Sequence, residues 1–171
     1  MTSIIRATTS NSELLADIGR LTFIESHGKS ASESDIDFYI SEKFTYEVFQ
    51  EELSDAGNIY HILYNQGQPI GYSKIEFNCQ TPNIQPKNVT KLGRLYLLKE
   101  FYELKLGLEL FNFNIELSKN NNQAGIWLFV WKQNERAVNF YRKNGFETIG
   151  SYNFEISATH SNPNHQMFLK Y

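Results

Sequence analysis

The clearest pattern in the chain is a short apolar run that a polar break separates from an amphipathic segment. Residues 126–131, IWLFVW, are continuously apolar and rich in aromatic and β-branched side chains, which favours a strand buried on both faces. After the break, Ala137, Phe140 and Tyr141 recur at helical spacing, and Asn134 can cap the first turn. Gly145 follows, where a left-handed C-cap needs no side chain. The pattern predicts a strand, a tight turn and a helix between residues 125 and 146.

The first third of the chain predicts one strand followed by helices. Residues 3–7 have the pattern of an edge strand, and Ser12 is the natural N-cap of a helix that ends near residues 24–25. A polar break over residues 28–34 precedes a second helix over 36–44, and Thr45 starts a third that Gly57 ends. These helices precede the main sheet, where such an insertion builds either a groove or ordinary packing.

The remaining strands are predicted in antiparallel pairs. Residues 59–64 and 70–77 form a hairpin around the turn at 65–69, and a loop over 81–89 leads to a strand at 92–98. Residues 147–156 and 165–170 form a closing pair, separated by a polar loop over 157–164. No repeat, low-complexity tract or linker interrupts the pattern, so we expect a single domain over residues 1–171.

Residues 101–120 have an ambiguous pattern. Leu104 to Leu110 alternate as in a half-buried strand, but the parity slips at Phe111, and strands typically have roughly 5 to 6 residues. Helical spacing accommodates both halves, so we predict a helix. The element order then indicates an α/β (α+β) fold: a mixed, mostly antiparallel twisted sheet of about seven strands, with helices on both faces and a central right-handed parallel β-α-β crossover.

Composition narrows the classes of function. The chain has 171 residues, of which 41% are hydrophobic, and a formal net charge of −3, which argues against a general nucleic-acid binder and allows a cationic substrate. Cys79 is the only cysteine, which excludes an internal disulfide and a thiolate cluster and leaves a buried or incidental thiol. There is neither an apolar run of about 18 residues nor a signal h-region, so we expect a cytoplasmic protein with no membrane partner.

The histidines give no sign of a metal site. His27 and His61 lack metal-ligand spacing, and His160 with His165 is interpreted as an exposed pair in the last loop. We therefore expect no metal.

The run WLFVWKQNERAVNFYRKNGF at residues 127–146, together with residues 95–111, resembles the GNAT superfamily of acetyl-CoA-dependent N-acetyltransferases, and within it the bacterial polyamine N-acetyltransferase branch. The resemblance implies the fold predicted above and the transfer of an acetyl group from acetyl-CoA to a primary amine. The amine would attack directly in a ternary complex. The expected partner is a small-molecule amine, and the expected state is a monomer or a homodimer formed through the closing strands.

The resemblance also implies where the cofactor binds. Main-chain groups of Leu95, Tyr96 and Leu97 would lie beside the thioester, with an N–H near Leu97 polarising its carbonyl. The phosphate-binding turn of the family would begin a helix, whose free N–H groups bind anions. That turn falls on Tyr102, Glu103, Leu104, Lys105, Leu106 and Gly107, followed by Leu108. Only Gly107 keeps a family glycine, while Tyr102 replaces the usual Gln or Arg and Lys105 could add a cationic contact.

Two residues of the motif have both a functional and a structural interpretation. The resemblance places Asn134 along the pantetheine arm, although the same residue can be an ordinary helix cap. It also makes Tyr141 the acid that protonates the leaving thiolate, although an aromatic residue on an amphipathic helix can simply be core. A thiol has a pKa near 8.5 and a tyrosine near 10, so this proton transfer is only mildly uphill.

The general base departs from the family pattern. Related enzymes carry a glutamate where this chain has Gly93, and Lys91 occupies the other nearby position on the same face. A water chain, Glu76, Glu25 or the capture of a neutral amine remain as alternatives. The missing glutamate also weakens the case for a polyamine. Acidic residues of the helical insertion could bind an ammonium ion or could form a solvated helix face: Glu25, Asp35, Asp37 and Glu42.

Two non-catalytic alternatives follow from the same departures. The chain could bind acyl-CoA as a sensor or partner without turnover, or it could keep the fold without the cofactor.

Overall fold

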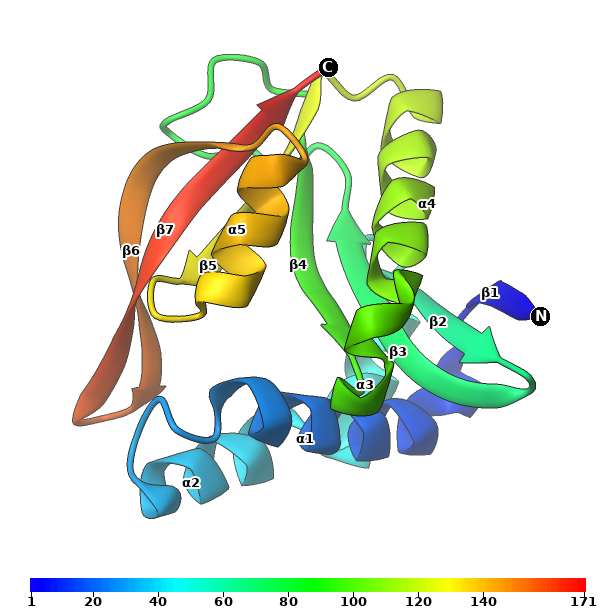
Figure 1. Cartoon of the computed structure of the whole chain (residues 1–171), viewed down its shortest axis with the longest axis vertical. Helices are drawn as coiled ribbons and strands as arrows, with labels where there is room; N and C mark the ends of the chain where they lie inside the picture. The colour runs from blue at the N-terminus through cyan, green and yellow to red at the C-terminus, as the bar shows by residue number, and fades with distance from the viewer.

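Seven strands form one mixed sheet in the order β1-β2-β3-β4-β5-β7-β6, in which only β4 and β5 run parallel (Figure 1). This computed structural model describes all 171 residues. The strands are β1 (Thr2–Arg6), β2 (Ile59–Asn65), β3 (Gln68–Glu76), β4 (Thr90–Leu97), β5 (Gly125–Trp131), β6 (Glu147–Ser157) and β7 (His160–Lys170). The predicted mixed, mostly antiparallel sheet is confirmed.

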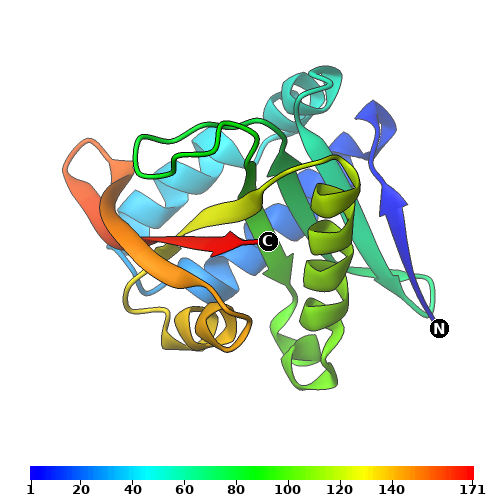
Figure 2. The same cartoon turned by 90° about the horizontal axis from the view of Figure 1, so that it is seen from above.

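Helices cover both faces of the sheet, as predicted. They are α1 (Ser12–His27), α2 (Glu33–Lys43), α3 (Tyr46–Ser54), α4 (Leu106–Asn120) and α5 (Glu135–Lys143). Figure 2, seen from above, shows α2 and α3 on one side of the strands and α4 and α5 on the other. Because successive strand residues point to opposite faces, Tyr60 packs with the core of α1–α3 whereas Ile59 packs with that of α4 and α5.

The two parallel strands pair over a very short length. Thr90 pairs with Ile126 and Lys91 with Trp127, and no pairs follow. Beyond that point β4 is paired only with β3, and β5 only with β7. Figure 1 shows the two strands together near the C-terminus of the chain and separating toward α1. Backbone groups on the facing edges of both strands therefore have no neighbouring strand to bond.

The predicted loop over residues 157–164 is wrong. β6 continues to Ser157, and β7 begins at His160 with only a tight turn between them. The polar start of β7 is stable as a strand because the Asn162 amide donates to Ser30 Oγ at 2.8 Å, and His160 bonds the Ser30 carbonyl at 2.8 Å. His160 and His165 therefore lie half-buried on a strand, and their interpretation as an exposed loop pair is also wrong.

Two predicted helix starts need correction. The predicted helix over 101–120 begins only at Leu106, because residues 99–104 form a 3₁₀ helix and Lys105 adopts a left-handed φ of 59°. Asn11, not Ser12, occupies the N-cap position of α1, which follows a short 3₁₀ turn. The end of α1 lies at His27, beyond the predicted end, where the His27 ring stacks on Phe23 at 4.9 Å between centroids.

The motif at residues 125–146 folds as predicted. The Asn134 side chain accepts a hydrogen bond from the Ala137 N–H at 3.2 Å, and Gly145 has a φ of 88°. Thr45 caps α3 in the same way, through the Val48 N–H at 3.2 Å. None of the helices combines the length and the apolar character that crossing a membrane would require.

Candidate active site

A cavity of about 340 Å³ lies where β4 and β5 separate. One wall consists of β3 and β4, with residues 91–97 along it, and the other consists of β5, β6 and β7. Tyr141 and Arg136 of α5 and His27 of α1 complete the lining. The short β4–β5 pairing therefore leaves an opening between these two strands in the middle of the sheet.

The structure brings six of the residues predicted from the sequence to this cavity. They are Leu95, Tyr96, Leu97, Tyr102, Asn134 and Tyr141. The others lie outside it, on the 3₁₀ turn and the first turn of α4 directly after Tyr102: Glu103, Leu104, Lys105, Leu106, Gly107 and Leu108.

Tyr141 presents a phenol that has no partner within the protein. Its ring packs against Phe111, Phe140 and Phe146, and the residue is 8% exposed. Its hydroxyl makes no hydrogen bond to another residue, and Tyr141 is part of the cavity lining. Burial raises the pKa of Tyr141, and the nearby Arg136 opposes that effect only in part. Tyr141 is therefore protonated at neutral pH and can act as a proton donor.

The start of α4 has the features of an anion site. Lys105 precedes the helix in a left-handed conformation, and the first N–H groups of any helix lack partners within it. A Cβ added to Gly107 would meet only Leu97 Cδ2, at 3.8 Å. Packing therefore does not require glycine at this position, and the backbone there is open to the close approach of a ligand.

Arg136 is a cation that the sequence patterns did not single out. Its guanidinium lies 3.6 Å above the ring of Tyr102, and it forms no ion pair with any carboxylate. Both residues line the cavity on the side of α4 and α5. The position of Arg136, two residues after the capping Asn134, could have indicated a place near the start of the helix and the cavity. Helical periodicity assigned Arg136 only to the solvent-facing side of the helix.

Among the carboxylates considered as a base, the structure places Glu76 in the cavity and the others outside it. Glu25 instead accepts a hydrogen bond from the Lys99 N–H at 2.8 Å. Glu76 stands on β3 beside Gly93 of β4, and a Cβ built on Gly93 would lie 3.7 Å from Glu76 Oε1. The Glu76 carboxylate therefore occupies the region that a side chain at position 93 would enter.

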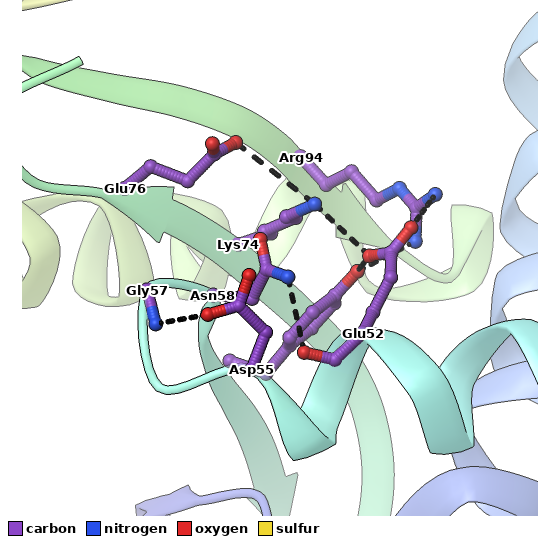
Figure 3. Close-up of polar contacts among 8 residues, drawn as sticks. Glu52, Asp55, Gly57, Asn58, Lys74, Glu76 and Arg94 are labelled. Atoms are coloured by element: carbon purple, nitrogen blue, oxygen red, sulfur yellow. Dashed lines mark hydrogen bonds and ion pairs between the residues drawn. The ribbon is translucent and has the colours of Figure 1, made fainter.

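A partly buried ionic network holds Glu76 in place (Figure 3). Lys74 Nζ lies 3.0 Å from Glu52 Oε2 and 3.9 Å from Glu76 Oε1, and Figure 3 shows it between the two carboxylates. Arg94 lies 3.5 Å from Glu52 and donates to the Tyr60 hydroxyl at 2.8 Å. Burial alone would raise the pKa of Glu52, but Arg94, the Tyr60 hydroxyl and Lys74 together lower it, so Glu52 is ionised at neutral pH.

His27 is a second group in the cavity that sequence patterns missed, because they tested it only as a metal ligand. Its Nδ1 lies 2.7 Å from Ser26 Oγ, and its ring lies between Phe23 and Trp131. Burial lowers the pKa of His27 to about 4, so the imidazole is neutral at pH 7. It adds a polar group without charge to the floor of the cavity.

Comparison with solved structures defines the class of protein to which this fold belongs. The PaiA N-acetyltransferase from Thermoplasma acidophilum, solved with coenzyme A, aligns with a TM-score of 0.79 and 23% identity over 100% of this chain and 99% of that one. The aminoglycoside acetyltransferase AAC(6')-Ib, also solved with coenzyme A, aligns with a TM-score of 0.67 and 20% identity over 99% of this chain and 95% of that one. The fold is that of the N-acetyltransferases.

Sequence comparison identifies the family. The chain belongs to the acetyltransferase (GNAT) family, whose model matches residues 24–146. An uncharacterized N-acetyltransferase in the pepI 3′ region of Lactobacillus delbrueckii subsp. lactis is 30% identical over 140 residues, which are 81% of this chain and 80% of the relative. The GNAT resemblance of residues 127–146 is thus confirmed, and the protein is an acyltransferase; its assignment to the polyamine branch stays a prediction.

Proposed function

We propose that the protein transfers the acetyl group of acetyl-CoA to the nitrogen of a small primary amine, with both substrates bound together in the cavity between β4 and β5. The observation that carries the proposal is a single cavity lined both by Tyr141, whose hydroxyl bonds no other residue, and by Glu76. A proton donor and a proton acceptor in the same cavity are what aminolysis of a thioester requires.

The residues present fit the cosubstrate. Lys105 and Gly107 at the start of α4 would hold the pyrophosphate, and Arg136 would add a cationic contact. Unpaired main-chain groups of residues 95–97 would bond the pantetheine arm and the acetyl carbonyl, with Asn134 beside them. Acetyl-CoA supplies the acetyl group as an activated thioester.

The chemistry then needs only two proton movements. The amine nitrogen bonds the acetyl carbon as the carbon–sulfur bond breaks, and the amine proton leaves through Glu76 to solvent. Tyr141 donates a proton to the departing sulfur and recovers one from solvent, so the products are an acetamide and the free thiol of CoA. Holding amine and thioester together supplies much of the acceleration, because the pair is intrinsically reactive.

The non-catalytic alternatives receive no support from the site. An acyl-CoA sensor or a fold without a cofactor has no need of Glu76 and Tyr141 in the lining of one cavity. Assembly as a monomer or homodimer stays a prediction, in which the edge strand β6 of the closing pair offers the pairing surface.

A thiol-release assay with acetyl-CoA and a panel of amines tests the proposal. Acceptor-dependent release of CoA is expected, and Tyr141→Phe should lower kcat by about 100-fold or more. Its melting temperature should remain unchanged, because the lost hydroxyl bonds no other residue. Tyr46→Phe, at a half-exposed position on α3, is the matched control. Undiminished turnover by Tyr141→Phe would remove the acid role, and no release with any amine would refute the proposed activity.

A further inference from the structure

Two opposite charges on neighbouring strands face the cavity without pairing with each other. Glu76 and Lys91 are directly opposed in the β3–β4 ladder, so their side chains emerge on the same face, and both line the cavity. The ion pairs in this region join Lys74 to Glu52 and Glu76, and Arg94 to Glu52; Lys91 takes part in none. The two side chains thus place a negative carboxylate and a positive ammonium side by side.

Lys91 lacks any anionic partner in the protein. Its ammonium lies 5.4 Å from the centre of the Trp127 ring, and the residue is half-buried. A cation that lies beside an aromatic ring and is partly shielded from water interacts more strongly with an anion than an exposed cation does. A ligand that carries an anion can therefore bind favourably to Lys91.

The opposite wall contributes an unsatisfied polar side chain. Asn164 of β7 is 7% exposed and lines the cavity, and its buried Oδ1 has no hydrogen-bond partner. Beside it, the rings of Phe129 and Tyr152 stack at 4.4 Å between centroids. A buried amide without partners signals a ligand that supplies them, and the stacked rings offer that ligand an apolar surface.

The charge balance of the cavity excludes a polycation as the best-fitting acceptor. Glu76 is the only carboxylate in the lining; of the four cations there, Lys74 and Arg94 pair with Glu52 behind it, and Lys91 and Arg136 have no carboxylate partner. A polyamine would bring several ammonium groups toward these cations, and like charges in a partly dry site repel strongly.

We infer that the acceptor is an amine with a carboxylate beside it, as in the head group of an α-amino acid, bound with its nitrogen at Glu76 and its carboxylate at Lys91. An aromatic or apolar side chain rests on Phe129 and Tyr152, where the Asn164 amide can bond a polar group at the far end of the acceptor. This inference rests on the proposed acetyltransferase function and names the substrate class of its acceptor.

Three acceptors that differ only in the carboxylate test the inference: L-phenylalanine, L-phenylalaninamide and 2-phenylethylamine, with spermidine as the polycation. A contact between a carboxylate and an ammonium is worth roughly 10- to 100-fold, so L-phenylalanine should exceed the other two in kcat/KM by that factor. Lys91→Met should remove this preference by lowering kcat/KM for L-phenylalanine to the level of 2-phenylethylamine in the same variant. Lys87→Met, at an exposed position outside the cavity, should keep the preference.

The outcomes separate the inference from the function on which it rests. Equal kcat/KM values for the three acceptors, a preference for spermidine, or a preference for L-phenylalanine that survives Lys91→Met would each overturn the inference while the enzyme is active. CoA release with other amines but none of the three would overturn it as well. Silence with every amine would refute the acetyltransferase proposal itself.

Discussion

Moving the cavity carboxylate from β3 to β4 tests whether Glu76 performs the role that a residue at position 93 performs in related enzymes. Glu76→Gln keeps the size of the side chain but removes its charge and its basicity. Loss of a general base lowers the rate by typically 10²- to 10⁴-fold, so kcat/KM should fall within that range. Gly93→Glu in the same chain should then restore activity to within about tenfold of the original protein.

The structure indicates that neither Glu76→Gln nor Gly93→Glu should destabilise the fold strongly. A Cβ on Gly93 would lie 3.6 Å from Lys74 Cδ and 3.7 Å from Glu76 Oε1, which are ordinary van der Waals distances, and Gly93 has no positive φ. Glu76→Gln weakens one ion pair at 3.9 Å, but Lys74 keeps Glu52 at 3.0 Å. Because the Glu76 side chain is 30% exposed, the free energy of unfolding should change by about 1 kcal/mol or less.

Steady-state thiol release on the two single variants and the double variant, with the melting temperature of each, completes the test. Glu25→Gln is the control, because Glu25 bonds the Lys99 N–H outside the cavity and should not be needed for turnover. Full activity of Glu76→Gln would show that the amine loses its proton by another route. A double variant no faster than Glu76→Gln would show that the carboxylate acts only from β3.

Two further predictions concern stability. Burial lowers the pKa of His27 and of His61 to about 4 from an unfolded value near 6.5. The folded protein therefore binds fewer protons than the unfolded chain in this range. The free energy of unfolding should be highest above pH 6.5 and should fall between pH 6.5 and 4, by about 3 kcal/mol for His61. Urea unfolding at several pH values should show a shallower fall for His61→Leu. Glu52→Gln should cost about 1 to 3 kcal/mol by leaving the partly buried Arg94 without its carboxylate, whereas Glu51→Gln, on the exposed side of α3, should leave the thermal unfolding curve unchanged.

Sequence patterns sufficed where several local signals agreed. The apolar run at 126–131, the cap at Asn134 and the glycine at 145 each predict the same strand–turn–helix, and the structure has all three. The prediction for residues 160–164 failed because every one of them is polar or Pro, so local propensity indicates a loop. Ser30, which bonds His160 and Asn162, lies far away in the sequence, so no local window contains this part of the reason why they form a strand.

The candidate site was predictable on the side of the cofactor and much less so on the side of the acceptor. Residues of the motif, such as Tyr141 and Asn134, reach the cavity because one strand and the helix that follows it carry them together. The choice between Glu25 and Glu76 depends on the pairing of β3 with β4, which no residue type reveals. His27 reaches the cavity because α1 continues to this residue, whereas the sequence predicted that the helix ends near residues 24–25.

A single irregularity in that pairing explains the chemistry of the acceptor side. The register shifts between Lys74 and Ile75, so that Lys74 opposes Arg94 while Ile75 opposes Leu92, and Gly93 is left over in β4. In a regular strand, residues 91 and 94 would point to opposite faces, since side chains alternate. The extra residue puts Lys91 and Arg94 on the face that carries Lys74 and Glu76. Glycine at the bulge leaves room for the Glu76 carboxylate, so the same irregularity places Glu76 of β3 and Lys91 of β4 side by side in the cavity lining.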